Sequence, residues 1–118
     1  MKITIQVMTP PYTTQDLDSA LNIAEAGLDR GHEVVLFLFS DSILAVNTRV
    51  KPIRIDRCIH ERIGSLISEK GLRVDICGIC MDYRGVTKDD VVEGSESSGL
   101  PELAELIATS DRVINFMA

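Results

Sequence analysis

Two cysteines three residues apart, Cys77 and Cys80, are the side chains of this sequence best suited to covalent chemistry. Cys77 ends the third predicted strand, and the glycine after it allows the backbone to turn sharply. If a helical turn begins there, its free N–H groups would stabilise a Cys77 thiolate, and Arg84 would add to that effect. The negative charges of Asp75 and Asp82 would destabilise a Cys77 thiolate. Position alone therefore leaves two interpretations open, a reactive thiol and a packed structural cysteine.

The Cys-x-x-Cys spacing of Cys77 and Cys80 also occurs in dithiol redox pairs and in halves of zinc sites. Redox pairs of the thioredoxin type follow the first strand of their unit and lead into a long helix, whereas this pair follows the third predicted strand. A zinc site would need two more ligands, and only Cys58, His32 and His60 remain, without a second close pair. We therefore expect no metal site, and a dithiol redox role stays an alternative.

Polar residues follow the first two predicted strands and form a candidate binding site. Tyr12 and Thr13 come after the first strand, and Asp41 and Asn47 come after the second. Because ligands gather at the carboxyl ends of parallel strands, we expect these side chains to line a pocket beside the cysteines, with Arg84 as a fifth binding candidate. No glycine-rich phosphate loop is present, so no cofactor is predicted.

The elements that must position these residues are predicted from apolar periodicity and turn signals. Strands are expected at residues 3–8, 33–39, 72–77 and 112–117. Helices are expected from a capping box at residues 13–16 to Gly31, and at residues 56–70, 88–93 and 101–108. Residues 40–52 are expected to form a long loop with one helical turn at 42–45, and residues 94–99 a polar loop. Cys58 lies near the apolar stripe of the second helix, so packing explains it.

Alternation of strands and helices with short connections predicts right-handed crossovers and a sheet covered on both faces. We expect one domain over residues 1–118, a flavodoxin-like three-layer α/β sandwich with a mainly parallel sheet of four to five strands. The length of 118 residues suits one hydrophobic core.

Composition narrows the possible partners. The net charge of −6 at pH 7 argues against direct nucleic-acid binding, which requires clustered Lys and Arg. No apolar run is long enough to suggest a membrane span, and no secretory signal precedes the first strand. The odd number of three cysteines fits thiols in a reducing compartment rather than a disulfide framework, so we expect a cytoplasmic protein.

Several segments in order resemble the DsrE/DsrF-like family of sulfur-relay proteins, over nearly the whole chain. The segments that carry the resemblance are Pro-Tyr-Thr-Thr-Gln at 11–15, Gly-His-Glu-Val at 31–34, Cys-Gly-Ile-Cys-Met-Asp-Tyr-Arg-Gly-Val at 77–86, Ser-Gly-Leu-Pro-Glu-Leu-Ala at 98–104 and Asp-Arg-Val-Ile-Asn-Phe at 111–116. In the sulfur-carrying members a cysteine stands seven residues before the Arg of an Arg-Gly pair, and counting back from Arg84 gives Cys77.

The resemblance implies that the Cys77 thiolate accepts a persulfide sulfur and passes it to an acceptor thiol, as a possible sulfurtransferase subunit. It also implies sulfur donor and acceptor proteins as partners, and a homo-oligomer (trimer or hexamer) or a hetero-oligomer with related subunits. Two alternatives stay open. One is a non-catalytic oligomeric binding module in which Cys77 is packed, and the other is a Cys77/Cys80 dithiol redox protein.

Overall fold

The computed structural model describes residues 1–54 and 57–117, which fold around one parallel sheet. Its five strands stand in the order β4-β3-β2-β1-β5, and every neighbouring pair is parallel. The strands are β1 (Lys2–Val7), β2 (Glu33–Leu38), β3 (Arg73–Cys77), β4 (Glu96–Ser98) and β5 (Arg112–Phe116). The α-helices are α1 (Asp16–Asp29), α2 (Ile59–Lys70), α3 (Gly78–Tyr83) and α4 (Leu100–Thr109), and the 3₁₀ helices are η1 (Ser40–Val46) and η3 (Lys88–Asp90).

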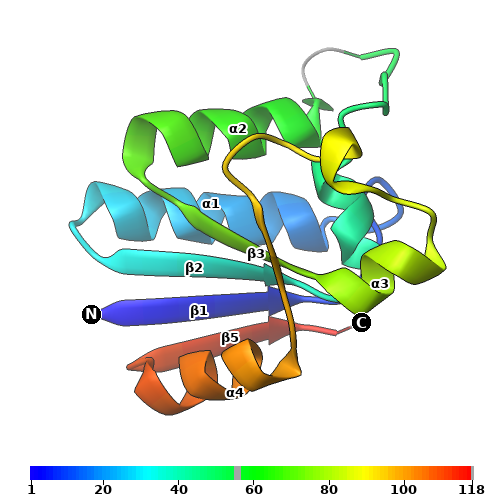
Figure 1. Ribbon diagram of the computed structural model, residues 1–118. Helices are drawn as coiled ribbons and strands as arrows, with labels where there is room; N and C mark the ends of the chain where they lie inside the picture. The colour runs from blue at the N-terminus through cyan, green and yellow to red at the C-terminus, as the bar shows by residue number, and fades with distance from the viewer. Residues whose placement is uncertain (55–56, 118) are drawn as a thin grey trace.

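Helices cover both faces of the sheet, which makes three layers (Figure 1). Helices α1 and α2 lie side by side on one face, and α4 covers the other. Helix α1 buries the stripe Leu17, Ala20, Leu21 and Ala24, as its helical spacing requires. The predicted α/β sandwich with a mainly parallel sheet of four to five strands is confirmed. The strand order differs from the 2-1-3-4-5 order of flavodoxin, because β1 here lies between β2 and β5.

The central strand β2 is buried on both faces, as its continuous apolar run predicts. A Cβ atom added to Gly27 of α1 would lie 3.0 Å from Val34, which places α1 on the face of Val34. Register and alternation then put Asp75 and Cys77 of β3 on the opposite face, the one that α4 covers. Cys77 therefore ends its strand on the more thinly covered side of the sheet.

Some predicted elements are wrong in type or extent. Helix α2 begins at Ile59 with Cys58 as its N-cap, so Cys58 is not inside the helix; the expected start at residue 56 lies outside the described residues. The expected helix at 88–93 is one 3₁₀ turn, η3, because the chain then extends and bridges Val91 to Asn47. The expected loop at 94–99 contains β4. Within the described part of the chain, none of the helices could cross a membrane.

Candidate functional site

Cys77 is both the last residue of β3 and the N-cap of α3. Its sulfur accepts a hydrogen bond from the backbone N–H of Cys80, with a nitrogen–sulfur distance of 3.4 Å. The chain passes from strand to helix without a loop because Gly78 leaves room for β4: a Cβ atom there would lie 2.7 Å from the Ser97 hydroxyl oxygen. The predicted helical turn after Cys77 is thus present, and it directs backbone N–H groups toward the sulfur.

The Cys77 thiol is buried and remains protonated at neutral pH. Cys77 is 4% exposed and Cys80 is 8% exposed. Burial raises the pKa of Cys77 above its ordinary value, and a hydrogen bond with the Cys80 side chain raises it further. The N–H groups of Cys80 and Ile79 lower that pKa, but less than these two effects raise it. The expected stabilisation of a thiolate by the helix start is therefore outweighed by desolvation.

A network of hydrogen bonds around Cys80 connects α3 to the start of η1. The backbone N–H of Ser40 donates to the Cys80 sulfur at 3.2 Å. The Arg84 guanidinium donates to the Cys80 carbonyl oxygen at 3.1 Å and forms an ion pair with Asp41 at 2.8 Å. Of the predicted binding residues, the structure thus brings Asp41 and Arg84 next to the cysteine segment. Ser40 carried no sequence signal, because it acts through its backbone.

The other predicted binding residues have different surroundings. The Tyr12 hydroxyl oxygen accepts a hydrogen bond from the Ile59 N–H at 3.0 Å, so Tyr12 caps the N-terminus of α2. Asn47 closes a turn, where its side-chain oxygen accepts the N–H of Arg49 at 3.0 Å. Thr13 is exposed on the surface. The structure therefore does not gather Tyr12 and Asn47 with Asp41 around the cysteines.

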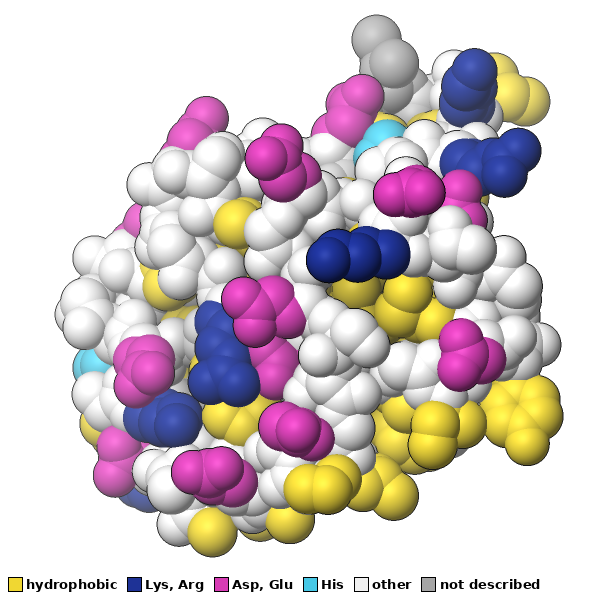
Figure 2. All heavy atoms as spheres, in the orientation of Figure 1, with side chains coloured by type: hydrophobic (Ala, Val, Ile, Leu, Met, Phe, Trp, Pro, Cys, Tyr) yellow, Lys and Arg dark blue, Asp and Glu magenta, His cyan; other side chains and the backbone are white. Residues whose placement is uncertain are grey.

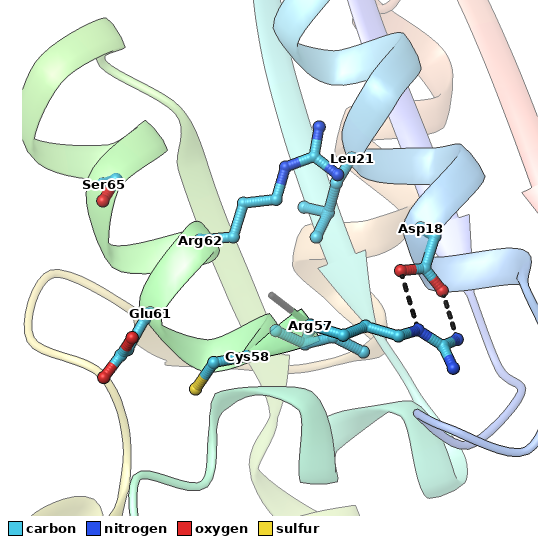
Figure 3. Close-up of a pocket in the computed structure, with 8 residues that line it drawn as sticks. Asp18, Leu21, Arg57, Cys58, Glu61, Arg62 and Ser65 are labelled. Atoms are coloured by element: carbon cyan, nitrogen blue, oxygen red, sulfur yellow. Dashed lines mark hydrogen bonds and ion pairs between the residues drawn. The ribbon is translucent and has the colours of Figure 1, made fainter. Parts of the chain in front are cut away.

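A pocket of about 270 Å³ opens between α1 and α2 (Figure 3). Both of its arginines have acidic partners: Arg57 pairs with Asp18 at 2.6 Å, and Arg62 pairs with Glu25 at 3.1 Å. The side chain of Cys58 points away from these guanidinium groups (Figure 3), and its sulfur lies 3.3 Å from the His60 ring nitrogen. Both guanidinium groups of the pocket therefore form ion pairs that join α1 to α2 or to the residues just before it.

A larger groove of about 1140 Å³ runs along the other side of α3, between α3, β4 and the start of α4. Ile79 and Leu100 line it and are 68% and 60% exposed. Tyr83, one turn after Ile79, is 85% exposed. Hydrophobic side chains gather in this region of the surface, toward the lower right of Figure 2. Gly78 lines the groove, and Cys77 does not.

In the described part of the chain, no three His, Cys, Asp or Glu side chains are arranged to hold a metal ion. All three cysteines are free thiols. Cys77 and Cys80 lie in contact, so the site can support thiol chemistry.

Relatives and solved structures match the chain over almost its whole length. It is 30% identical to the sulfurtransferase TusD of Klebsiella pneumoniae, over 98% of this chain and all of the relative. It is 29% identical to an uncharacterized protein of Methanocaldococcus jannaschii, again over 98% of this chain and all of that protein. The crystal structure of the ychN protein from E. coli superimposes with a TM-score of 0.88 at 28% identity, covering 98% of this chain and 99% of that one.

A protein of unknown function from Methanobacterium thermoautotrophicum shares the fold, with a TM-score of 0.76 at 14% identity over 97% of both chains. The model of the DsrE/DsrF-like family matches residues 1–116. That match takes in every strand and helix described above, including the turn that carries both cysteines. This chain therefore belongs to the DsrE/DsrF-like family.

Proposed function

We propose that this protein serves in a sulfur relay and that Cys77 carries the transferred sulfur as a persulfide. The observation that carries the proposal is the position of Cys77 at a strand-to-helix junction, where the N–H of Cys80 donates to its sulfur, in a chain related to TusD sulfurtransferases. Backbone N–H groups directed at a sulfur stabilise negative charge on it, which the Cys77 sulfur bears as the attacking thiolate and again as the leaving thiolate.

The proposed transfer has two steps. The Cys77 thiolate attacks the outer sulfur of a donor persulfide; the new sulfur–sulfur bond forms on Cys77 and the donor leaves as a thiolate. An acceptor thiolate then attacks the outer sulfur on Cys77, and Cys77 leaves as the thiolate. Each step exchanges one sulfur–sulfur bond for another, so no external oxidant or reductant is required.

Burial of Cys77 sets a condition on this function. A thiol that is 4% exposed cannot meet a protein thiol unless α3 moves or a partner opens the site. Ile79 and Tyr83 lie on one face of α3 and project into solvent, so they offer a contact surface for donor and acceptor proteins. We propose that such a partner displaces α3 while it docks.

Mass spectrometry of the intact protein tests the carrier role. After treatment with a persulfide donor, Cys80→Ser and the double variant Cys58→Ser/Cys80→Ser should gain the mass of one sulfur atom, about 32 Da, and Cys77→Ser/Cys80→Ser should not. Cys58→Ser/Cys80→Ser is the matched control, because Cys58 caps α2 away from α3. Sulfur that loads equally well onto Cys77→Ser/Cys80→Ser would disprove the assignment.

Two other functions each have an observation in their favour. The burial and raised pKa of Cys77 favour a non-catalytic oligomeric binding module, for which donor treatment would leave the mass unchanged. The contact between Cys77 and Cys80 favours a dithiol redox protein, for which mild oxidation alone would remove two hydrogens from the wild type and none from Cys80→Ser.

A further inference from the structure

Ser40 has a backbone conformation that serine rarely adopts. Its φ angle is 60°, in the left-handed region where a Cβ atom is unfavourable. Such strain persists only where surrounding contacts hold it, and it is concentrated at functional sites. Its effect here is on direction: the turn aims the Ser40 N–H at the Cys80 sulfur, 3.2 Å away.

Contacts on both sides hold this turn in place. Arg84 donates to the Asp41 carboxylate at 2.9 Å, to the Ser40 hydroxyl oxygen at 3.5 Å and to the Cys80 carbonyl oxygen at 3.1 Å. One guanidinium thus fixes the donor loop and the acceptor helix relative to each other. On the far side, the buried Ser42 hydroxyl oxygen accepts the Phe39 N–H at 2.8 Å.

The Cys80 sulfur has a hydrogen-bond donor from the start of η1 on one side and the Cys77 thiol on the other. Ser40 donates to the Cys80 sulfur, and the Cys77 thiol lies in hydrogen-bond contact with the Cys80 side chain. The nearby charges of Asp41 and Arg84 compensate each other in an ion pair. Asp82 is exposed and lines the groove on the other side of α3.

We propose that Cys80 discharges the sulfur held on Cys77 as sulfide, and that Ser40 is the positioning residue that holds the Cys80 sulfur for this attack. The inference rests on the proposed function, because the Cys77 persulfide is the group attacked. It gives the site a second outcome, release of sulfide, besides transfer to an acceptor thiol.

The step balances within the chain. The Cys80 thiolate attacks the inner sulfur of the Cys77 persulfide, the Cys77–Cys80 disulfide forms, and the outer sulfur leaves as HS⁻ with the bonding electron pair. The carried sulfur is reduced and the two cysteines are oxidised. Two molecules of an external thiol then reduce the disulfide and restore both cysteines. The two external thiols are themselves oxidised to a disulfide.

Sulfide release from the loaded full chain tests the role of Cys80. After loading with inorganic polysulfide and desalting, the wild type and the matched control Cys58→Ser should release sulfide and lose two hydrogens relative to the reduced protein. Cys80→Ser should keep the added sulfur and release at least about tenfold less sulfide, as expected when the attacking thiol is absent. Equal release from Cys80→Ser would overturn the proposal.

Two variant pairs test the positioning role of Ser40. Ser40→Val places a branched side chain at a positive φ and should slow sulfide release by about tenfold. Glycine adopts that φ freely and keeps the backbone N–H, so Ser40→Gly should release sulfide at the wild-type rate. Arg84→Gln should slow release similarly, and Arg62→Gln, which breaks the Glu25 ion pair elsewhere, should not. For every variant, the rate of sulfide release is divided by the amount of sulfur loaded on Cys77. Poor loading is then not mistaken for slow release.

A separate arm distinguishes failure of this inference from failure of the relay. If Cys77 takes up no sulfur, the relay proposal fails. Glutathione disulfide then forms a mixed disulfide on Cys77, and Cys80 attacks the Cys77 sulfur of that disulfide and releases glutathione as the thiolate. Cys80→Ser should accumulate a glutathione mixed disulfide on Cys77, whereas the wild type should resolve it to the internal disulfide. A mixed disulfide that persists equally in both proteins, or forms in neither, would refute the role of Cys80.

Discussion

At the scale of single residues, the Cys77 sulfur experiences opposing effects of desolvation and hydrogen bonding. Removal from water favours the neutral thiol, and the N–H groups at the start of α3 favour the thiolate. Desolvation is the largest of these contributions, so the resting chain stores a protonated thiol. Protonation protects the sulfur from adventitious oxidation until a partner or a movement of α3 exposes it.

The raised pKa of Cys77 predicts a loss of stability at alkaline pH. Above the ordinary value of 9.0 the unfolded chain releases this proton while the folded chain keeps it, so the free energy of unfolding falls as pH rises. Below that value the contribution is constant. Urea unfolding of the wild type and Cys77→Ala between about pH 7 and pH 10.5 should show a shallower alkaline decline in the variant. Parallel declines would contradict the raised pKa.

At the scale of elements, the short edge strand β4 depends on a buried carboxylate in β3. Asp75 is 2% exposed, accepts two hydrogen bonds from Arg73 at 2.9 Å, and accepts the Ser98 hydroxyl at 3.0 Å. The hydrogen bond with Asp75 raises the pKa of Arg73. Because β4 has only three residues, this contact supplies much of its attachment beside Cys77.

Asp75→Asn should therefore destabilise the chain and loosen β4. The amide cannot accept from both Arg73 and Ser98 as the carboxylate does, and the loss should be about 2 kcal/mol, below the value for fully buried pairs because Arg73 is half exposed. Asp29→Asn, which weakens an exposed pair with Lys70, is the matched control and should lose clearly less stability. Urea unfolding measures both, and equal losses would contradict the role of Asp75.

At the scale of the whole molecule, the exposed apolar side chains are distributed unevenly. Ile79 and Tyr83 of α3 project into solvent, and Leu100 and Met117 are 60% and 56% exposed. The yellow surface of Figure 2 concentrates over α3, α4 and the C-terminal end. Apolar patches of this kind are typical of contact surfaces, so we propose that the part formed by α4 and the C-terminal end meets other copies of the chain, while the part on α3 stays free for relay partners.

Self-association through this surface is a prediction for the intact chain. We expect analytical ultracentrifugation to give a multiple of the 13.0 kDa chain mass, with a trimer or hexamer as the expected species. Leu100→Glu, at the start of α4, should shift the distribution toward the monomer. Ile23→Glu, at an exposed apolar position on α1, should leave it unchanged. A wild type that sediments as a monomer at every concentration would rule out this prediction.

Local patterns were sufficient for the strongly periodic elements and failed for the polar ones. Residues 33–39 were predicted as a buried strand because an unbroken apolar run has few other solutions. Strand β4, Glu-Ser-Ser, has no apolar alternation, and it exists because it pairs with Asp75–Cys77. The expected helix after Thr87 fails because Val92 donates to the Val46 carbonyl oxygen at 2.9 Å, which draws the chain into an extended path.

The sequence by itself determined the parallel sheet and the positions of its four apolar strands, because these follow from periodicity along the chain. It also marked Cys77 and Cys80 as candidates for chemistry, by their spacing and by the resemblance to a family. Only the tertiary structure decided how deeply the Cys77 sulfur is buried and which donors reach each thiol. The physical reason is distance along the chain: Ser40 and Cys80 are 40 residues apart, and desolvation depends on every layer packed around the sulfur.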